Sequence, residues 1–398
     1  YEAGEFDPFI DNDPISRGVN PGILFATDRQ RATPDDKKFR YFTFHRGQML
    51  HLGEAHVKLG TDGGADWEEL KRISLLKDRT ENYPLEVESA EIFGVLESTI
   101  PLSDDATEHS AEPAQRFFAE IDQRLDRSRS RDVYIYVHGY RVDFENPVLV
   151  SAELWHFLGY NGAFIAYSWP TKNAMFGYFA DLDSSINSAR YLRTLILDIA
   201  RNTTAERIHV IGYSAGTRLV GRMIADFGIY GAAMSDEKLK QGTQLGKVIL
   251  IGADIDQDIL AGYLYDGALR IPNALTLYVS ESDSALRFSR FLFRGRERAG
   301  ELLERRPLNE REQAFFEDNP NLRIIDVSFA EGGTGGNGHS YFRSSPWVSS
   351  DLLTSLLYDL SPEERGLVLD DELPVWEFPA DYISRLRQGI ERRDKSGE

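Results

Sequence analysis

The sequence contains no cysteine and no long apolar run. Without cysteine the chain has no thiol nucleophile, no disulfide bond and no cysteine-ligated metal site. The apolar runs are shorter than the about 18–20 residues that a membrane-spanning helix needs, so no transmembrane segment is predicted. No signal peptide is visible, but the chain begins with Tyr1 rather than methionine, which is compatible with a leader removed before this numbering. The sequence therefore indicates neither a cytoplasmic nor an extracytoplasmic location.

Positive charge is also scarce. Lysine and arginine together number 45 against 64 acidic residues, which gives a net charge of −19 and a sequence pI of 4.9. A surface of this charge repels nucleic acid and anionic membranes, so nucleic acid is excluded as a partner. The 398 residues, of which 41% are hydrophobic, are enough to bury a large core.

Short apolar runs alternate with amphipathic segments in most of the chain. The runs lie at residues 133–137, 163–167, 208–211, 248–251, 275–279 and 322–327. Apolar residues recur at helical spacing over 184–201, and a further helix is expected from 215 to about 227. Buried strands that alternate with helices are typical of a mostly parallel sheet covered on both faces. We therefore predict an α/β fold with its chemistry at the carboxyl ends of the strands.

The earlier residues show a different pattern. Between about 22 and 101 we expect short strands separated by turns, followed by a helix around 112–125 whose first turn accommodates Pro113. The domain prediction is an irregular arm (1–22), a single catalytic domain (23–385) and a solvated tail (386–398).

A serine lies in the sequence Gly-Tyr-Ser-Ala-Gly at 212–216, directly after the predicted strand 208–211 and directly before a helix. This is G-x-S-x-G in the strand–turn–helix context of a nucleophile elbow. The turn is so tight that only small side chains fit two residues before and after the serine. We predict Ser214 as the nucleophile, with the backbone N–H of Ala215 directed at a developing oxyanion.

A second oxyanion donor and a base are needed beside such a serine. The strand 133–137 ends in His138-Gly139-Tyr140, and we assign the second donor to the backbone of Tyr140, with Arg141 as its alternative and His138 as a structural residue of the turn. Of the eight histidines only His339 follows Ser214 in the chain, and we predict it as the base. The nearby Gly333–Gly338 fits G-x-G-x-x-G but follows the last predicted strand, so it is interpreted as a loop.

Two segments compete to supply the acid that orients the base. Asp283 and Glu281 follow the strand 275–279, whereas Asp254 and Asp256 follow the strand before it. The acid usually comes from the loop after the strand two beyond the nucleophile strand, which favours Asp283. The aspartates from 254 to 258 lack the glycine and glutamate of an EF-hand loop, so no metal site is predicted.

The blocks quoted above, together with Ala26-Thr27-Asp28-Arg29, Ser168-Trp169-Pro170 and Gly338-His339-Ser340-Tyr341-Phe342, occur in one order along the chain. In this order they resemble a bacterial family of α/β hydrolases, the esterase/lipase-like family DUF900, over about residues 23 to 380. The resemblance implies a single catalytic domain with an α/β-hydrolase fold and a triad of Ser214, Asp283 and His339. Arg141 and Val142 stand after Tyr140 where such proteins often have asparagine, which leaves the details of the oxyanion hole open.

The predicted reaction is hydrolysis of a small-molecule carboxylic ester through an acyl-enzyme on Ser214, without a cofactor. Phe144, Trp169 and Tyr213 are candidates for lining the pocket, with ordinary core packing as the alternative. Two further hypotheses are an acyltransferase or amidase that uses the same triad, and a non-catalytic binding module at the cell envelope. The sequence indicates neither the natural substrate nor the oligomeric state.

Overall fold

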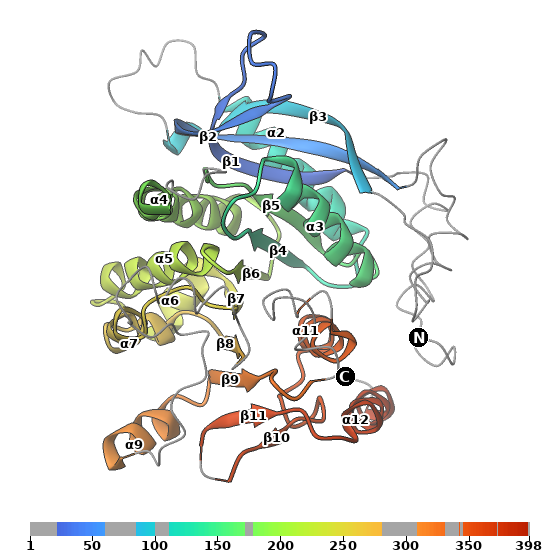
Figure 1. Cartoon of the computed structure of the whole chain (residues 1–398), viewed down its shortest axis with the longest axis vertical. Coiled ribbons are helices and arrows are strands. Elements are labelled where there is room, and N and C mark those ends of the chain that lie inside the picture. The colour runs from blue at the N-terminus through green and yellow to red at the C-terminus, as the bar shows by residue number, and fades with distance from the viewer. Residues whose placement is uncertain are drawn as a thin grey trace. The chain divides into compact units, whose positions relative to one another are not determined.

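Figure 1 presents the computed structural model of the chain. It describes residues 22–59, 85–99, 111–171, 178–280, 309–330, 342, 345–371 and 373–396. The chain forms two compact parts, residues 1–208 and 209–398, and each is described by itself. No helix in these described ranges has the length and apolar character needed to cross a membrane.

The first part contains strands in the order β4-β5-β1-β2-β3. Their bounds are β1 (Ile23–Arg31), β2 (Phe42–Leu59), β3 (Leu85–Val95), β4 (Asp132–Val137) and β5 (Ala163–Tyr167). The pairs β4–β5 and β5–β1 are parallel, whereas β1–β2 and β2–β3 are antiparallel. Its helices are η1 (Glu97–Thr99), α2 (Glu112–Asp126), α3 (Glu145–Phe157) and α4 (Tyr178–Asn202).

The antiparallel strands differ from the short strands expected for this region. β2 is one continuous strand of 18 residues, and its pairing with β1 contains register shifts. Such shifts let a long strand bend and twist without ending. The helix expected around 112–125 is confirmed as α2, which has Pro113 in its first turn and buries Phe117, Phe118 and Ile121.

The second part contains strands in the order β6-β7-β8-β9-β11-β10. They are β6 (Arg207–Tyr213), β7 (Leu245–Ile251), β8 (Ala274–Val279), β9 (Leu322–Asp326), β10 (Val368–Leu369) and β11 (Val375–Glu377). Its helices are α5 (Gly216–Tyr230), α6 (Asp236–Thr243), α7 (Gln257–Tyr265), η4 (Ala268–Arg270), α9 (Glu310–Asp318), α11 (Pro346–Tyr358) and α12 (Tyr382–Ser396).

The strand directions confirm the predicted α/β class. The pairs β7–β8, β8–β9 and β9–β11 are parallel, and β10 is antiparallel to β11. Every residue of β4, β5, β7 and β8 is buried. In a strand that is covered on both faces, successive side chains are all buried. Such a strand therefore appears in the sequence as a continuous apolar run rather than as alternating apolar and polar residues.

The chain terminus differs from the solvated tail expected from residue 386. Residues 386–396 continue the helix α12, and Leu386 is buried one turn after the fully buried Tyr382. Two apolar side chains at this spacing lie on one face of a helix, so that face packs while the charged residues stay outside. The predicted arm 1–22 lies outside the described residues except for Gly22. The assignment of residues 23–385 to a single catalytic domain stays a prediction.

Candidate active site

Ser214 occupies the turn between β6 and α5, in a backbone conformation that side-chain-bearing residues rarely adopt. Its φ is +52°, in the left-handed region, and its side chain is half-buried. A Cβ placed on Gly212 would lie 3.0 Å from Val220 Cγ2. The close approach of α5 therefore requires a small residue at 212, as the motif predicts.

Hydrogen bonds hold this turn from several sides. The Ser214 N–H donates to the carbonyl of Ile251 over 2.9 Å, which ties the turn to the end of β7. The Ser214 carbonyl accepts from the Thr217 N–H at 3.0 Å and from the Thr217 hydroxyl at 2.6 Å. The Asp254 N–H in turn donates to Thr217 Oγ1 over 3.1 Å. A strained residue persists when its surroundings over-determine it in this way, and such residues cluster at active sites.

Ala215 is buried and stands at the N-cap position of α5 without a side-chain cap. The first N–H groups of a helix have no intrahelical acceptor, and the helix dipole adds a partial positive charge at this end. The Ser214 side chain therefore lies beside backbone donors suited to an anion.

The alternative acids Asp254 and Asp256 both have structural contacts. Asp256 is the N-cap of α7, where its Oδ1 accepts from the N–H groups of Asp258 and Ile259 at 3.1 and 3.3 Å. Asp254 Oδ2 accepts from Arg218 Nε at 3.3 Å, and the side chains of this pair are 6% and 14% exposed. Asp283, Glu281 and His339 lie outside the described residues, so the triad stays a prediction.

The predicted pocket residues are packed in different ways. Phe144 is buried among Phe25 and Phe42, with ring centroids 4.9 and 4.8 Å away. Trp169 is buried and stacks on the His138 ring at 5.5 Å. Phe144 and Trp169 are therefore packed as core residues, which was the alternative to a role in the pocket. Tyr213 is half-buried, and its ring lies 4.9 Å from that of Phe342.

The predicted oxyanion loop begins at the end of β4. His138 is fully buried, and its Nδ1 lies 2.7 Å from the carbonyl oxygen of Gly139. The Trp169 indole N–H donates to the His138 carbonyl over 2.7 Å. Burial and the nearby Arg29 charge hold the pKa of His138 well below its ordinary value, so the ring is neutral. The histidine therefore holds the turn, as predicted for it.

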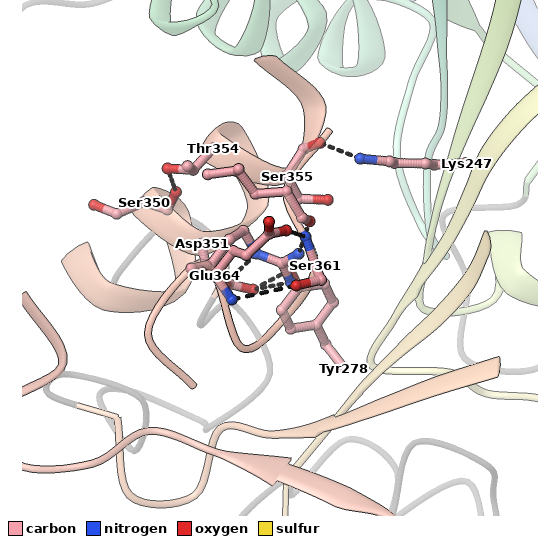
Figure 2. A network of polar contacts seen from close by, with 10 residues as sticks. Lys247, Tyr278, Ser350, Asp351, Thr354, Ser355, Ser361 and Glu364 are labelled. Carbon is pink, nitrogen blue, oxygen red and sulfur yellow. Dashed lines mark hydrogen bonds and ion pairs between the residues drawn. The ribbon is translucent and has the colours of Figure 1, made fainter. Parts of the chain in front are cut away.

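A buried ion pair without a signal in the sequence, together with a tyrosine hydroxyl, connects the strand before the predicted acid segment with the helix after the predicted base (Figure 2). Arg365 Nε and Nη2 donate to the two carboxylate oxygens of Asp351 at 2.7 and 3.1 Å, and the Tyr278 hydroxyl donates to Asp351 Oδ2 at 2.7 Å. Tyr278 belongs to β8, which precedes Asp283 in the chain, and Asp351 belongs to α11, which follows His339. The network therefore ties the end of β8 to the middle of α11 and to Arg365.

Lys247 of β7 extends the contacts of α11. Its ammonium group donates to the carbonyl of Ser355 and pairs with Asp359 Oδ1 at 2.7 Å. Burial lowers the pKa of Lys247 to about 8. Within the described ranges no group of three or more histidine, aspartate or glutamate side chains is arranged to hold a metal ion.

The parallel sheet, with a serine at left-handed φ between β6 and α5, is the architecture of an α/β hydrolase. The chain belongs to the family described as alpha/beta hydrolase of unknown function (DUF900), which matches residues 114–356. No curated protein matches the chain.

Several solved hydrolases overlap the chain weakly. A cell surface hydrolase of Lactobacillus plantarum WCFS1 is 13% identical, with a TM-score of 0.33, over 60% of this chain and 95% of that one. Esterase B of Lactobacillus rhamnosis is 13% identical, with a TM-score of 0.31, over 57% and 77% of the two chains. Esterase 2 of Thermogutta terrifontis is 14% identical, with a TM-score of 0.29, over 59% and 84%. At these TM-scores the overlaps add nothing to the family assignment.

Proposed function

We propose that the protein is a serine hydrolase that cleaves carboxylic esters through an acyl-enzyme on Ser214. The observation that carries the proposal is the left-handed backbone of Ser214, held between β6 and α5 by its bonds to Ile251 and Thr217. Serine has no intrinsic preference for the left-handed region, which residues with a Cβ seldom occupy. Strain of this kind supports a nucleophile that must stand clear of its strand.

In the proposed reaction His339 takes the proton of Ser214 Oγ as this oxygen attacks the ester carbonyl carbon. The tetrahedral oxyanion accepts hydrogen bonds from the backbone N–H groups of Ala215 and Tyr140. His339 then gives the proton to the leaving alcohol oxygen as its bond to carbon breaks. Asp283 stabilises the intervening imidazolium.

The second half of the reaction repeats the first with water. His339 deprotonates a water molecule, which attacks the acyl-enzyme carbonyl, and the serine leaves with the proton as the carboxylic acid is released. Neither half requires an oxidant, a reductant or a cofactor.

A fluorophosphonate probe tests the proposal because it phosphonylates only an activated serine. The wild-type protein should be labelled once, on the peptide that contains Ser214, as read by intact mass and peptide mapping. Ser214→Ala should not be labelled. Ser235→Ala is the matched control, since Ser235 caps α6 and should be dispensable for labelling. An unlabelled wild type, or a label on another serine, contradicts the proposal.

A further inference from the structure

Arg29 of β1 is a fully buried arginine whose donors converge on the predicted oxyanion loop. Its Nε donates to Ser168 Oγ at 3.0 Å, and its Nη2 donates to the carbonyl of Val142 at 3.0 Å. The same Nη2 lies 3.3 Å from His138 Nε2. Burying a guanidinium is costly unless its N–H groups are hydrogen-bonded, and these contacts offset that cost for Arg29.

The contact with Arg29 determines which nitrogen of His138 carries the proton. A guanidinium can only donate, so His138 Nε2 accepts from Arg29. In a neutral imidazole the other nitrogen, Nδ1, then carries the hydrogen and donates to the Gly139 carbonyl at 2.7 Å. The Trp169 carbonyl, 3.0 Å from Nε2, favours the opposite tautomer, but the full positive charge of Arg29 outweighs one carbonyl dipole.

This tautomer orients the next backbone N–H. In a trans peptide the C=O and the following N–H point in opposite directions. With the Gly139 carbonyl held toward the His138 ring, the N–H of Tyr140 is directed away from that ring. Tyr140 is the residue predicted to supply the second oxyanion donor.

The far end of the loop is fixed through Val142. Its carbonyl accepts from Arg29 Nη2 and also from the Thr171 hydroxyl, each at 3.0 Å. Between the two anchored ends Arg141 has a φ of +63°. A non-glycine residue in this region costs on the order of 1 kcal/mol or more and persists where neighbours over-determine it.

We infer that Arg29 is a positioning residue for the oxyanion donor at Tyr140, acting through His138 and Val142. The inference rests on the proposed function, in which that donor stabilises the tetrahedral intermediate. Arg29 acts from within the protein and does not touch substrate. The planar guanidinium is essential to this role, because its several N–H groups reach Ser168, Val142 and His138 at the same time.

Arg29→Lys is the decisive variant, since lysine keeps the charge but loses the fork. We expect kcat for p-nitrophenyl butyrate to fall about 10–100-fold with KM within about threefold of wild type, because a displaced donor is felt in the transition state. Inhibition by an alkyl boronic acid, which forms a tetrahedral anion on the serine, should weaken by a similar factor. All assays are run at a temperature at which circular dichroism shows each variant folded.

Arg124→Lys is the matched control. Arg124 is also a buried arginine of the first part, bonded to the carbonyls of Gly22 and Glu120, and it shares no partner with the loop. Its variant should keep the wild-type kcat and boronate affinity. Equal losses in both variants, or a folded Arg29→Lys protein with wild-type kcat, overturn the inference.

Thr171→Val decides the matter if Arg29→Lys does not fold, because it removes only the second donor to the Val142 carbonyl. We expect a fall in kcat of about 3–10-fold with KM unchanged, and an unchanged kcat overturns the inference. A wild type without activity that depends on Ser214 overturns the proposed function and this inference together. If the wild type is active and kcat is unchanged in Arg29→Lys and in Thr171→Val, the inference is overturned and the proposed function stands.

Discussion

Replacing Asp351 by asparagine should remove a large part of the stability of the second part of the chain. The Asp351 and Arg365 side chains are 0% and 1% exposed and are joined by two hydrogen bonds. The substitution keeps the shape of the side chain but leaves the Arg365 charge buried without its counter-charge. Removing one partner of such a pair costs about 3–5 kcal/mol, because the remaining ion is desolvated and uncompensated.

The chain contains an exposed pair of nearly the same geometry for comparison. Arg116 donates to both carboxylate oxygens of Glu91 at 2.6 and 2.8 Å, but these side chains are 46% and 58% exposed. Water screens an exposed pair, so Glu91→Gln should cost no more than about 1 kcal/mol. Tyr278→Phe removes one hydrogen bond to the carboxylate and should fall between the two, at about 1.5–3 kcal/mol.

Urea unfolding followed by tryptophan fluorescence and near-ultraviolet circular dichroism measures these differences. Arg365→Met alone should also be strongly destabilising, since it leaves Asp351 buried without its partner. The double variant, Asp351→Asn with Arg365→Met, should lose less than the sum of the two single changes. The reasoning is refuted if Asp351→Asn costs no more than Glu91→Gln, or if the double variant is additive.

Three further predictions concern separate sites. Burial raises the pKa of Asp28 from 3.8 to about 7, so the folded state retains a proton that the unfolded chain loses. The contribution of Asp28 to the free energy of unfolding should therefore fall by about 4 kcal/mol as pH rises from about 4 to about 7. In urea titrations at each pH this fall should appear as a change in the difference between wild type and Asp28→Asn, and parallel profiles of the two proteins would refute it. Asp256→Ala should cost about 1 kcal/mol through loss of the α7 cap while ester hydrolysis stays near wild type, whereas a collapse of kcat would make Asp256 the acid. Gly53→Ala should cost at least about 2 kcal/mol by thermal unfolding, because its Cβ would meet the Phe25 ring and the Glu91 carbonyl, and a neutral effect would show that β2 can shift.

The parallel strands could be predicted because burial on both faces leaves a local signal. β5 agrees with the predicted run 163–167 at both ends, and the continuous apolar sequence of β8 appears as 275–279. The edge strand β3 left no such signal. Its glutamates 86, 88 and 91 are exposed, and a half-covered edge strand with several charges resembles a loop in sequence.

Parts of the candidate site had a signal in the sequence, and other parts had none. The serine turn is encoded locally by small residues around Ser214, and Asp256 before Gln257 fits a helix N-cap. Arg29 and His138 are 109 residues apart, and Asp351 meets Arg365 across a helix end. Contacts between distant residues depend on the completed fold, so neither the loop anchor nor the buried ion pair could be predicted from spacing.

The most direct test of the proposed function is hydrolysis of p-nitrophenyl esters, from acetate to palmitate, by wild-type protein and by Ser214→Ala. The proposal predicts measurable turnover of at least one ester by the wild type and a loss of about 10⁴-fold or more in kcat for the variant. Turnover that survives the substitution, or a wild type that is inert on every ester and unlabelled by a fluorophosphonate, would contradict it.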